Sequence, residues 1–173
     1  MAEGVKRRKS AEAICRDFVR AVSWEIVRAA TVSHEETVGR LRNLGKFYVK
    51  QLEGHPKLAL EMRRRIAEQL LEQAIFRRSS LSVCRARLNA ASRLGFADVE
   101  RKAHCHMLYA LGASARGNKR VAKKIAAEIA NDLEQSLKKR EGLLARDCLA
   151  HARRFLKFIN SESNVMNRTS EHA

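Results

Sequence analysis

Proline occurs once in this 173-residue chain, at Pro56, and glycine occurs eight times. Sandwiches, barrels and arrays of hairpins need frequent turn residues, so a chain with so few of them does not fold in these ways. The hydrophobic fraction of 45% is too high for a wholly disordered protein, and the length allows one domain with a buried core. The sequence therefore predicts an all-α protein.

Hydrophobic residues recur at helical spacing in seven stretches. Ser33 and Glu36 have the spacing of a capping box, Pro56 suits the first position of a helix, and Gly112 is a typical residue just past a helix end. The predicted helices cover about 10–30, 33–53, 56–78, 79–95, 97–111, 118–139 and 142–159. A single all-α domain is expected over residues 10–159, with disordered segments at 1–9 and 160–173.

The apolar stripes of these helices predict which faces are buried. In the sixth helix the stripe is flanked by Ala122, Ala126 and Ala130, which predicts a narrow seam for close packing. In the first and last helices, the predicted buried positions are Ile14, Phe18, Val22 and Ile26, and Leu144, Cys148, Ala152, Phe155 and Ile159. The short connections predict antiparallel neighbours, as a stack of helical hairpins or as a closed bundle.

One part of the pattern resembles a known repeat. Leu111-Gly112 followed by Gly117-Asn118, Ala122 and Ala126 is similar to the tetratricopeptide repeat, with a connection about two residues short. Leu44-Gly45 with Tyr48 resembles the first-helix half of such a repeat. The resemblance implies a superhelical scaffold whose concave face binds a peptide or partner segment. Ordinary helix-hairpin packing predicts the same pattern of small residues.

The chain carries 35 Lys and Arg residues against 19 Asp and Glu residues, a formal net charge of +16. Solubility asks only about 2 to 8 net charges of a small domain, and self-repulsion of the surplus favours a polyanionic partner. Between Ile75 and Lys124 there are twelve basic residues and only two acidic ones, Asp98 and Glu100. A solvated basic face is the alternative interpretation, because acidic residues elsewhere can pair with part of this charge.

We expect the partner to be nucleic acid, RNA rather than DNA, or else an acidic protein segment. The aromatic residues fall mostly on apolar stripes, so binding is expected through the phosphate backbone and through shape, without a platform for stacking bases. On the last helix, Arg146, Arg153 and Lys157 form a predicted basic ridge. The predicted nucleic-acid contacts are Arg77, Arg78, Arg85, Arg87, Arg116, Lys119, Arg120, Lys123, Lys124, Arg146, Arg153 and Lys157.

The stretch from Arg146 and Asp147 to His151 resembles the motif of the HEPN ribonucleases. The resemblance implies that His151 transfers protons, that Arg146 stabilises charge on the scissile phosphate, and that Asp147 orients them. Residues five apart in a regular helix point about 140° away from each other, so Arg146 and His151 share a site only at a helix start. A surface pair between Asp147 and His151 is the alternative interpretation.

No metal or cofactor is expected. The two histidines of His104-Cys105-His106 lie on roughly opposite faces of a helix, so they cannot chelate one ion together. The four cysteines are spread singly beside apolar neighbours, which predicts reduced core thiols in an intracellular protein, cytoplasmic or nuclear and not secreted. No stretch approaches the roughly 18 apolar residues of a membrane span, so no membrane partner is expected.

These observations lead to three hypotheses about function. The first is a non-enzymatic, basic α-helical protein that binds nucleic acid or belongs to a ribonucleoprotein assembly. The second is a tetratricopeptide-like adaptor between proteins, and the third is a HEPN-like ribonuclease. The sequence does not predict the oligomeric state.

Overall fold

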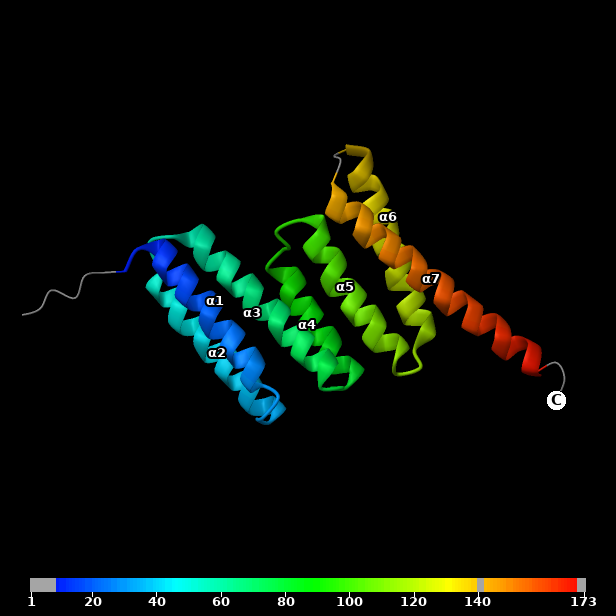
Figure 1. The fold of residues 1–173 in the computed structure, drawn as a ribbon, viewed down its shortest axis with the longest axis horizontal. Coiled ribbons are helices and arrows are strands. Elements are labelled where there is room, and N and C mark those ends of the chain that lie inside the picture. The colour runs from blue at the N-terminus through cyan, green and yellow to red at the C-terminus, as the bar shows by residue number, and fades with distance from the viewer. Residues whose placement is uncertain (1–8, 140–141, 171–173) are drawn as a thin grey trace, which may run out of the picture. The chain divides into compact units, whose positions relative to one another are not determined.

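The computed structural model describes residues 9–139 and 142–170, and over these residues the chain is all-α, with seven helices and no strand (Figure 1). This confirms the predicted fold class. The helices are α1 (Ala11–Arg28), α2 (His34–Gln51), α3 (Pro56–Phe76), α4 (Leu81–Arg93), α5 (Val99–Ser114), α6 (Lys119–Lys139) and α7 (Leu143–Ser170).

Local capping chemistry fixes the helix starts. The side chains of Ser10, Ser33 and Ser80 accept hydrogen bonds from backbone N–H groups three residues later, which satisfies donors that a helix start leaves unpaired. The capping box at Ser33 forms only in half. Glu36 donates its backbone N–H to Ser33 Oγ at 3.1 Å, but its carboxylate accepts from Arg40 Nη2 at 2.6 Å instead of reaching back.

The described chain divides into two compact units, with the boundary between Gln73 and Ala74 inside α3. The sequence predicts one domain over residues 10–159, and the boundary between the two units lies inside that stretch. In the first unit, α1, α2 and α3 share one core, and full burial contributes about 1.5–3 kcal/mol for each large apolar side chain. Its buried residues are Ile14, Phe18, Val22, Val38, Leu41, Leu52, Ala59, Met62, Ile66 and Leu70.

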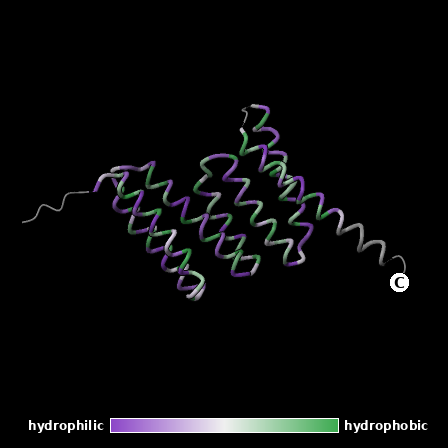
Figure 2. Tube along the Cα trace, viewed as in Figure 1, coloured by the Kyte–Doolittle hydropathy of each residue, from purple (hydrophilic) through white to green (hydrophobic). Residues whose placement is uncertain are grey.

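The second unit is built on α5, α6 and α7, which pack against one another, while α4 packs on α5. The predicted alanine seam of α6 is confirmed, since Ala122 and Ala126 are fully buried and Ala130 is 7% exposed. Small side chains at these positions let the helices approach closely. Figure 2 shows hydrophobic and hydrophilic residues alternating along the helices, as amphipathic packing requires.

Two predicted helix ends are wrong. Gly112 does not stop α5; it is buried inside the helix, where an added Cβ would lie 3.4 Å from Cγ2 of Ile75. The turn comes instead at Gly117, whose φ of +78° is the left-handed conformation that glycine adopts freely. The predicted end of the last helix lies near Ile159, but α7 continues to Ser170, because no Pro or Gly interrupts the chain there.

Burial confirms most of the predicted apolar faces and corrects two positions. Ile14, Phe18 and Val22 are buried in α1, but Ile26 is 38% exposed and Ala29 takes the next inward position. In α7 Leu144 is 62% exposed, because the inward stripe starts one residue later and follows helical spacing. Its buried residues are Ala145, Leu149, Ala152 and Ile159.

Candidate nucleic-acid interface

Positive charge is concentrated in the second unit. Residues 74–173 contain 20 Lys and Arg residues against nine Asp and Glu residues, whereas residues 1–73 contain 15 against ten. All twelve predicted nucleic-acid contacts belong to the second unit. Their suitability as contacts depends on whether their charges already have partners within the protein.

Five of the twelve predicted contacts are exposed cations, and none of them has a side-chain hydrogen bond or ion pair among the residues that the structure describes. An exposed cation without an internal partner can meet a phosphate without first breaking a contact. These five residues are the strongest of the predicted contacts. They are Arg78, Arg85, Arg120, Lys123 and Lys157.

The other predicted contacts already interact inside the protein. The guanidinium of Arg116 donates from Nη1 to the carbonyl oxygen of Gly112 at 2.6 Å and from Nη2 to that of Ser79 at 2.8 Å, so it is a structural residue. Lys124 lies 3.9 Å from a carboxylate oxygen of Glu128, an exposed and weak pair. The remaining predicted contacts that interact within the chain are Arg77, Arg87, Lys119, Arg146 and Arg153.

The start of α6 holds an unusual set of charges. Arg120, Lys123 and Lys124 are exposed in its first two turns, and the first turn has no acidic residue. The helix dipole places partial positive charge in the first turn, so Arg120 is disfavoured there by about 0.3–1 kcal/mol. A polyanion bound at this end would relieve the repulsion among these cations.

The basic ridge predicted on α7 is exposed. Arg146, Arg153 and Lys157 all lie outside the buried stripe of the helix. Arg153 is partly neutralised, because its Nη2 donates to a carboxylate oxygen of Glu134 on α6 at 2.8 Å. Lys157 is therefore the member of the ridge whose charge is left for a partner.

The expectation that aromatic residues lie on buried stripes is wrong at four positions. Trp24, Phe47, Phe76 and Phe158 are 65%, 60%, 72% and 53% exposed. In the second unit Phe76 directly precedes the basic pair at 77 and 78, and Phe158 follows Arg154 by one helical turn.

Exposed rings beside cations are the combination on which unpaired bases stack. Sequence reasoning missed these rings because helical spacing alone places them next to apolar positions. Burial, which depends on neighbouring helices, decides whether they are covered.

The motif that resembles HEPN ribonucleases lies within one continuous helix. α7 begins at Leu143, so Arg146 and His151 lie in regular turns about 140° apart and the structure does not bring them together. The ring of His151 does interact with Asp147, but through the backbone carbonyl oxygen at 2.8 Å and not through the carboxylate. The geometry does not assemble the catalytic arrangement that the resemblance implies.

The cysteine and histidine positions match packing roles. Cys105 is buried, His104 is exposed, and all four cysteines are free thiols. Burial raises the pKa of the Cys84 thiol, partly opposed by the Arg116 guanidinium, and burial also raises the pKa of Cys148. A raised pKa keeps a thiol protonated and unreactive at neutral pH. No group of three or more metal-ligating side chains occurs among the described residues.

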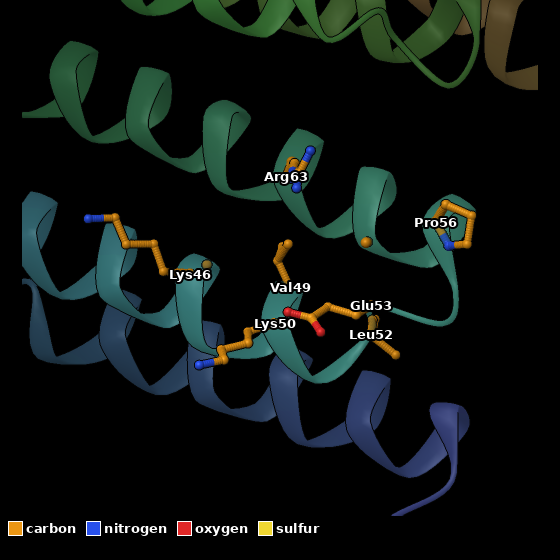
Figure 3. Close-up of a pocket in the computed structure, with 9 residues that line it drawn as sticks. Lys46, Val49, Lys50, Leu52, Glu53, Pro56 and Arg63 are labelled. Atoms are coloured by element: carbon orange, nitrogen blue, oxygen red, sulfur yellow. The ribbon is translucent and has the colours of Figure 1, made fainter.

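The first unit contains a cavity of about 640 Å³ between α2 and α3 (Figure 3). Lys46 and Lys50 project from α2 and Arg63 from α3, and Glu53 is the one acidic residue in its lining. Two signals in the sequence point to this cavity: the four-residue spacing of Lys46 and Lys50, and the run of three arginines that includes Arg63. The cavity is a second place where an anion could bind.

Within residues 9–139 and 142–170, no helix is both long and apolar enough to cross a membrane. No family model matches the chain, and neither a curated protein nor a solved structure does. Its function is therefore inferred from the residues and their geometry.

Proposed function

We propose that this chain is a non-enzymatic α-helical protein that binds single-stranded nucleic acid, RNA in preference to DNA, through its second unit. The observation that supports this most directly is the exposure of one aromatic ring close to exposed cations on α7. Phe158 is 53% exposed. Arg154, one helical turn before it, and Lys157, the residue before it, are exposed cations without side-chain partners among the described residues. Rings stack on bases and cations neutralise phosphates, and a single strand offers both.

The first test measures RNA affinity against salt. A labelled single-stranded RNA of about 20 nucleotides is titrated with the full chain, and anisotropy is read between 50 and 200 mM salt. Five phosphate contacts give a slope of about −3.5 in log affinity against log salt, a loss of roughly 100-fold over this range. An absence of binding at 50 mM salt would overturn the proposal.

The second test separates stacking from charge with two neighbouring residues. Phe158→Ala should weaken RNA binding by about 1–3 kcal/mol and leave the salt slope unchanged, because it removes a ring and no charge. Lys157→Ala should reduce the slope by about 0.7, because it removes one phosphate contact. Leu143→Ala is the matched control, since Leu143 is an 82% exposed apolar residue of the same helix. Equal losses for Phe158→Ala and Leu143→Ala would contradict stacking.

A second candidate function is a protein adaptor of tetratricopeptide-like architecture, and the first unit carries the observation that favours it. On α1, Trp24 and Val27 are 65% and 67% exposed, and their three-residue spacing places them on one face of the helix. Neighbouring exposed apolar side chains of this kind are typical of protein interfaces. Trp24 is the one tryptophan of the chain, so its fluorescence reports the surface directly. An acidic peptide that docks there should shift the emission to shorter wavelength, and unchanged emission would count against this function.

A further inference from the structure

A cavity of about 420 Å³ lies against α4, α5 and the start of α6 in the second unit. Its polar lining consists of Ser82, Arg85 and Asn89 from α4, Tyr109 from α5 and Asn118 at the N-cap of α6. The volume is within the range of pockets that hold small molecules. Of these side chains, only Arg85 belongs to the predicted nucleic-acid contacts.

Tyr109 is the most informative residue in the lining of the cavity. Tyr109 is only 2% exposed, and its hydroxyl oxygen is buried without a hydrogen-bond partner among the described residues. Buried polar groups in folded proteins are nearly always paired, because leaving one unpaired destabilises the fold. Because phenylalanine would pack here without the penalty, the unpaired hydroxyl of Tyr109 points to a partner beyond the described residues.

The other polar groups of the cavity favour an acceptor-rich ligand. The Oδ1 atom of Asn118 accepts from the backbone N–H of Val121 at 3.4 Å, so its amide nitrogen is left to donate. Arg85 is exposed and has no side-chain partner among the described residues. An anionic ligand with several acceptor oxygens or nitrogens matches these donors.

The face of α4 extends the site in one direction. Arg85, Asn89 and Arg93 follow one another at four-residue spacing, so they share a face of the helix. The rise of 1.5 Å per residue places the two arginines about 12 Å apart along the axis, on either side of an exposed amide. An asparagine amide offers one donor and one acceptor edge, the pattern that pairs with the edge of a base.

We propose that this cavity holds one unstacked nucleotide of the bound strand, an inference that depends on the proposed nucleic-acid function. Arg85 contacts its phosphate and the Asn89 amide pairs with the base edge. The Tyr109 hydroxyl, which is closed to solvent, pairs with a polar group of the nucleotide once the cavity wall opens around it. Arg93 lies beside the next phosphate along the strand. The apolar side chains of Leu81 and Val121 complete the walls against which the base lies.

The test uses the full chain and AMP as the probe, with adenosine and inorganic phosphate in parallel, read by chemical shifts and calorimetry. Arg85→Ala should weaken AMP binding at least tenfold, whereas Arg42→Ala, which removes an exposed arginine of α2 that lines neither cavity, should leave it unchanged. Tyr109→Phe should weaken it about three- to tenfold, the loss of one hydrogen bond, and leave the melting temperature unchanged or raise it. A structural role for the hydroxyl would instead lower the melting temperature.

Three results would overturn the proposal: equal AMP affinity in Tyr109→Phe, phosphate binding as tightly as AMP, or no AMP binding at all. The same variants titrated with RNA separate this inference from the proposed function. If Tyr109→Phe and Asn89→Ala bind RNA with unchanged affinity and salt slope, the nucleotide pocket is refuted and the single-strand function stands. If the chain binds AMP but not RNA, the single-strand function is refuted and the cavity is a site for a free nucleotide.

Discussion

Arg116 donates from Nη2 to the carbonyl oxygen of Ser79 at 2.8 Å, and so ties the C-terminal end of α5 to the connection before α4. Its Nη1 also donates to the carbonyl oxygen of Gly112 at 2.6 Å. A single guanidinium thus satisfies two carbonyl groups, a use that its position in a basic stretch of sequence does not indicate. Positive charge in this unit has at least two roles, and they can be separated by mutation.

Arg116→Ala should lower the free energy of unfolding by about 2 kcal/mol, because it removes charge-assisted hydrogen bonds from a half-buried site. The control is Arg120→Ala, an exposed arginine whose loss should change stability by less than about 0.5 kcal/mol. Urea denaturation followed by circular dichroism measures both. RNA affinity should respond in the opposite order, with the larger loss in Arg120→Ala, and a stable Arg116→Ala variant would contradict the structural role.

Two glycines of α2 provide a matched pair for stability. A methyl group added at Gly39 would have nothing within 4 Å, so Gly39→Ala should stabilise the protein by about 0.5–1 kcal/mol through helix propensity. At Gly45, an added Cβ would lie 3.1 Å from Cγ1 of Ile66, a buried core residue. Gly45→Ala should therefore be at least about 1 kcal/mol less stable than Gly39→Ala in the same denaturation assay. Equal stability would mean that Ile66 moves without cost.

The helices could be predicted because their signals are local. Ser33 and Ser80 cap helices through backbone groups three residues away, and Pro56 begins α3 at the position that suits its missing N–H. The predicted stop at Gly112 is wrong because the role of this glycine depends on contact with Ile75, which is distant in sequence. Glycine at a close helix crossing and glycine past a helix end look the same in one sequence.

The candidate site could be predicted only in outline. The concentration of charge after Ile75 is visible in the sequence, but which cations are paired is decided between helices. Lys102 pairs with Asp132 across 30 positions, and Arg153 with Glu134 across 19. Exposure of Phe158 and burial of the Tyr109 hydroxyl are likewise set by packing and not by periodicity.

The lowered pKa of His106 predicts how the stability of the fold depends on pH. Burial lowers its pKa, Lys102 lowers it further, and Asp132 and Glu128 oppose the shift. The unfolded chain therefore binds a proton before the folded protein does, and stability falls as the pH drops below about 6.5 towards the folded pKa.

Urea denaturation at pH 7.5 and pH 5.5 should show this loss, and His106→Gln should reduce it. His151→Gln is the control, because His151 is exposed and should leave the difference unchanged. The same pH dependence in both variants would rule out His106 as its source.

Arg78 offers a test in which stability and binding move in opposite directions. It closes the end of α3 with φ at +53°, and the backbone N–H of Ser79 donates to the carbonyl oxygen of Ala74 at 2.9 Å, the arrangement in which glycine usually stands. Arg78→Gly should raise the free energy of unfolding by about 0.5–1 kcal/mol, because it removes left-handed strain. It should also weaken RNA binding and reduce the salt slope by about 0.7, because it removes an exposed cation.

Arg78→Asn separates the two effects, since asparagine tolerates the left-handed conformation and carries no charge. It should lose RNA affinity as Arg78→Gly does and gain less stability. Arg93→Ala removes an exposed arginine at the last residue of α4, where φ is not positive, so it should weaken binding without the gain in stability. A loss of stability in Arg78→Gly, or unchanged RNA affinity in both Arg78 variants, would show that this arginine is retained for its packing and not for its charge.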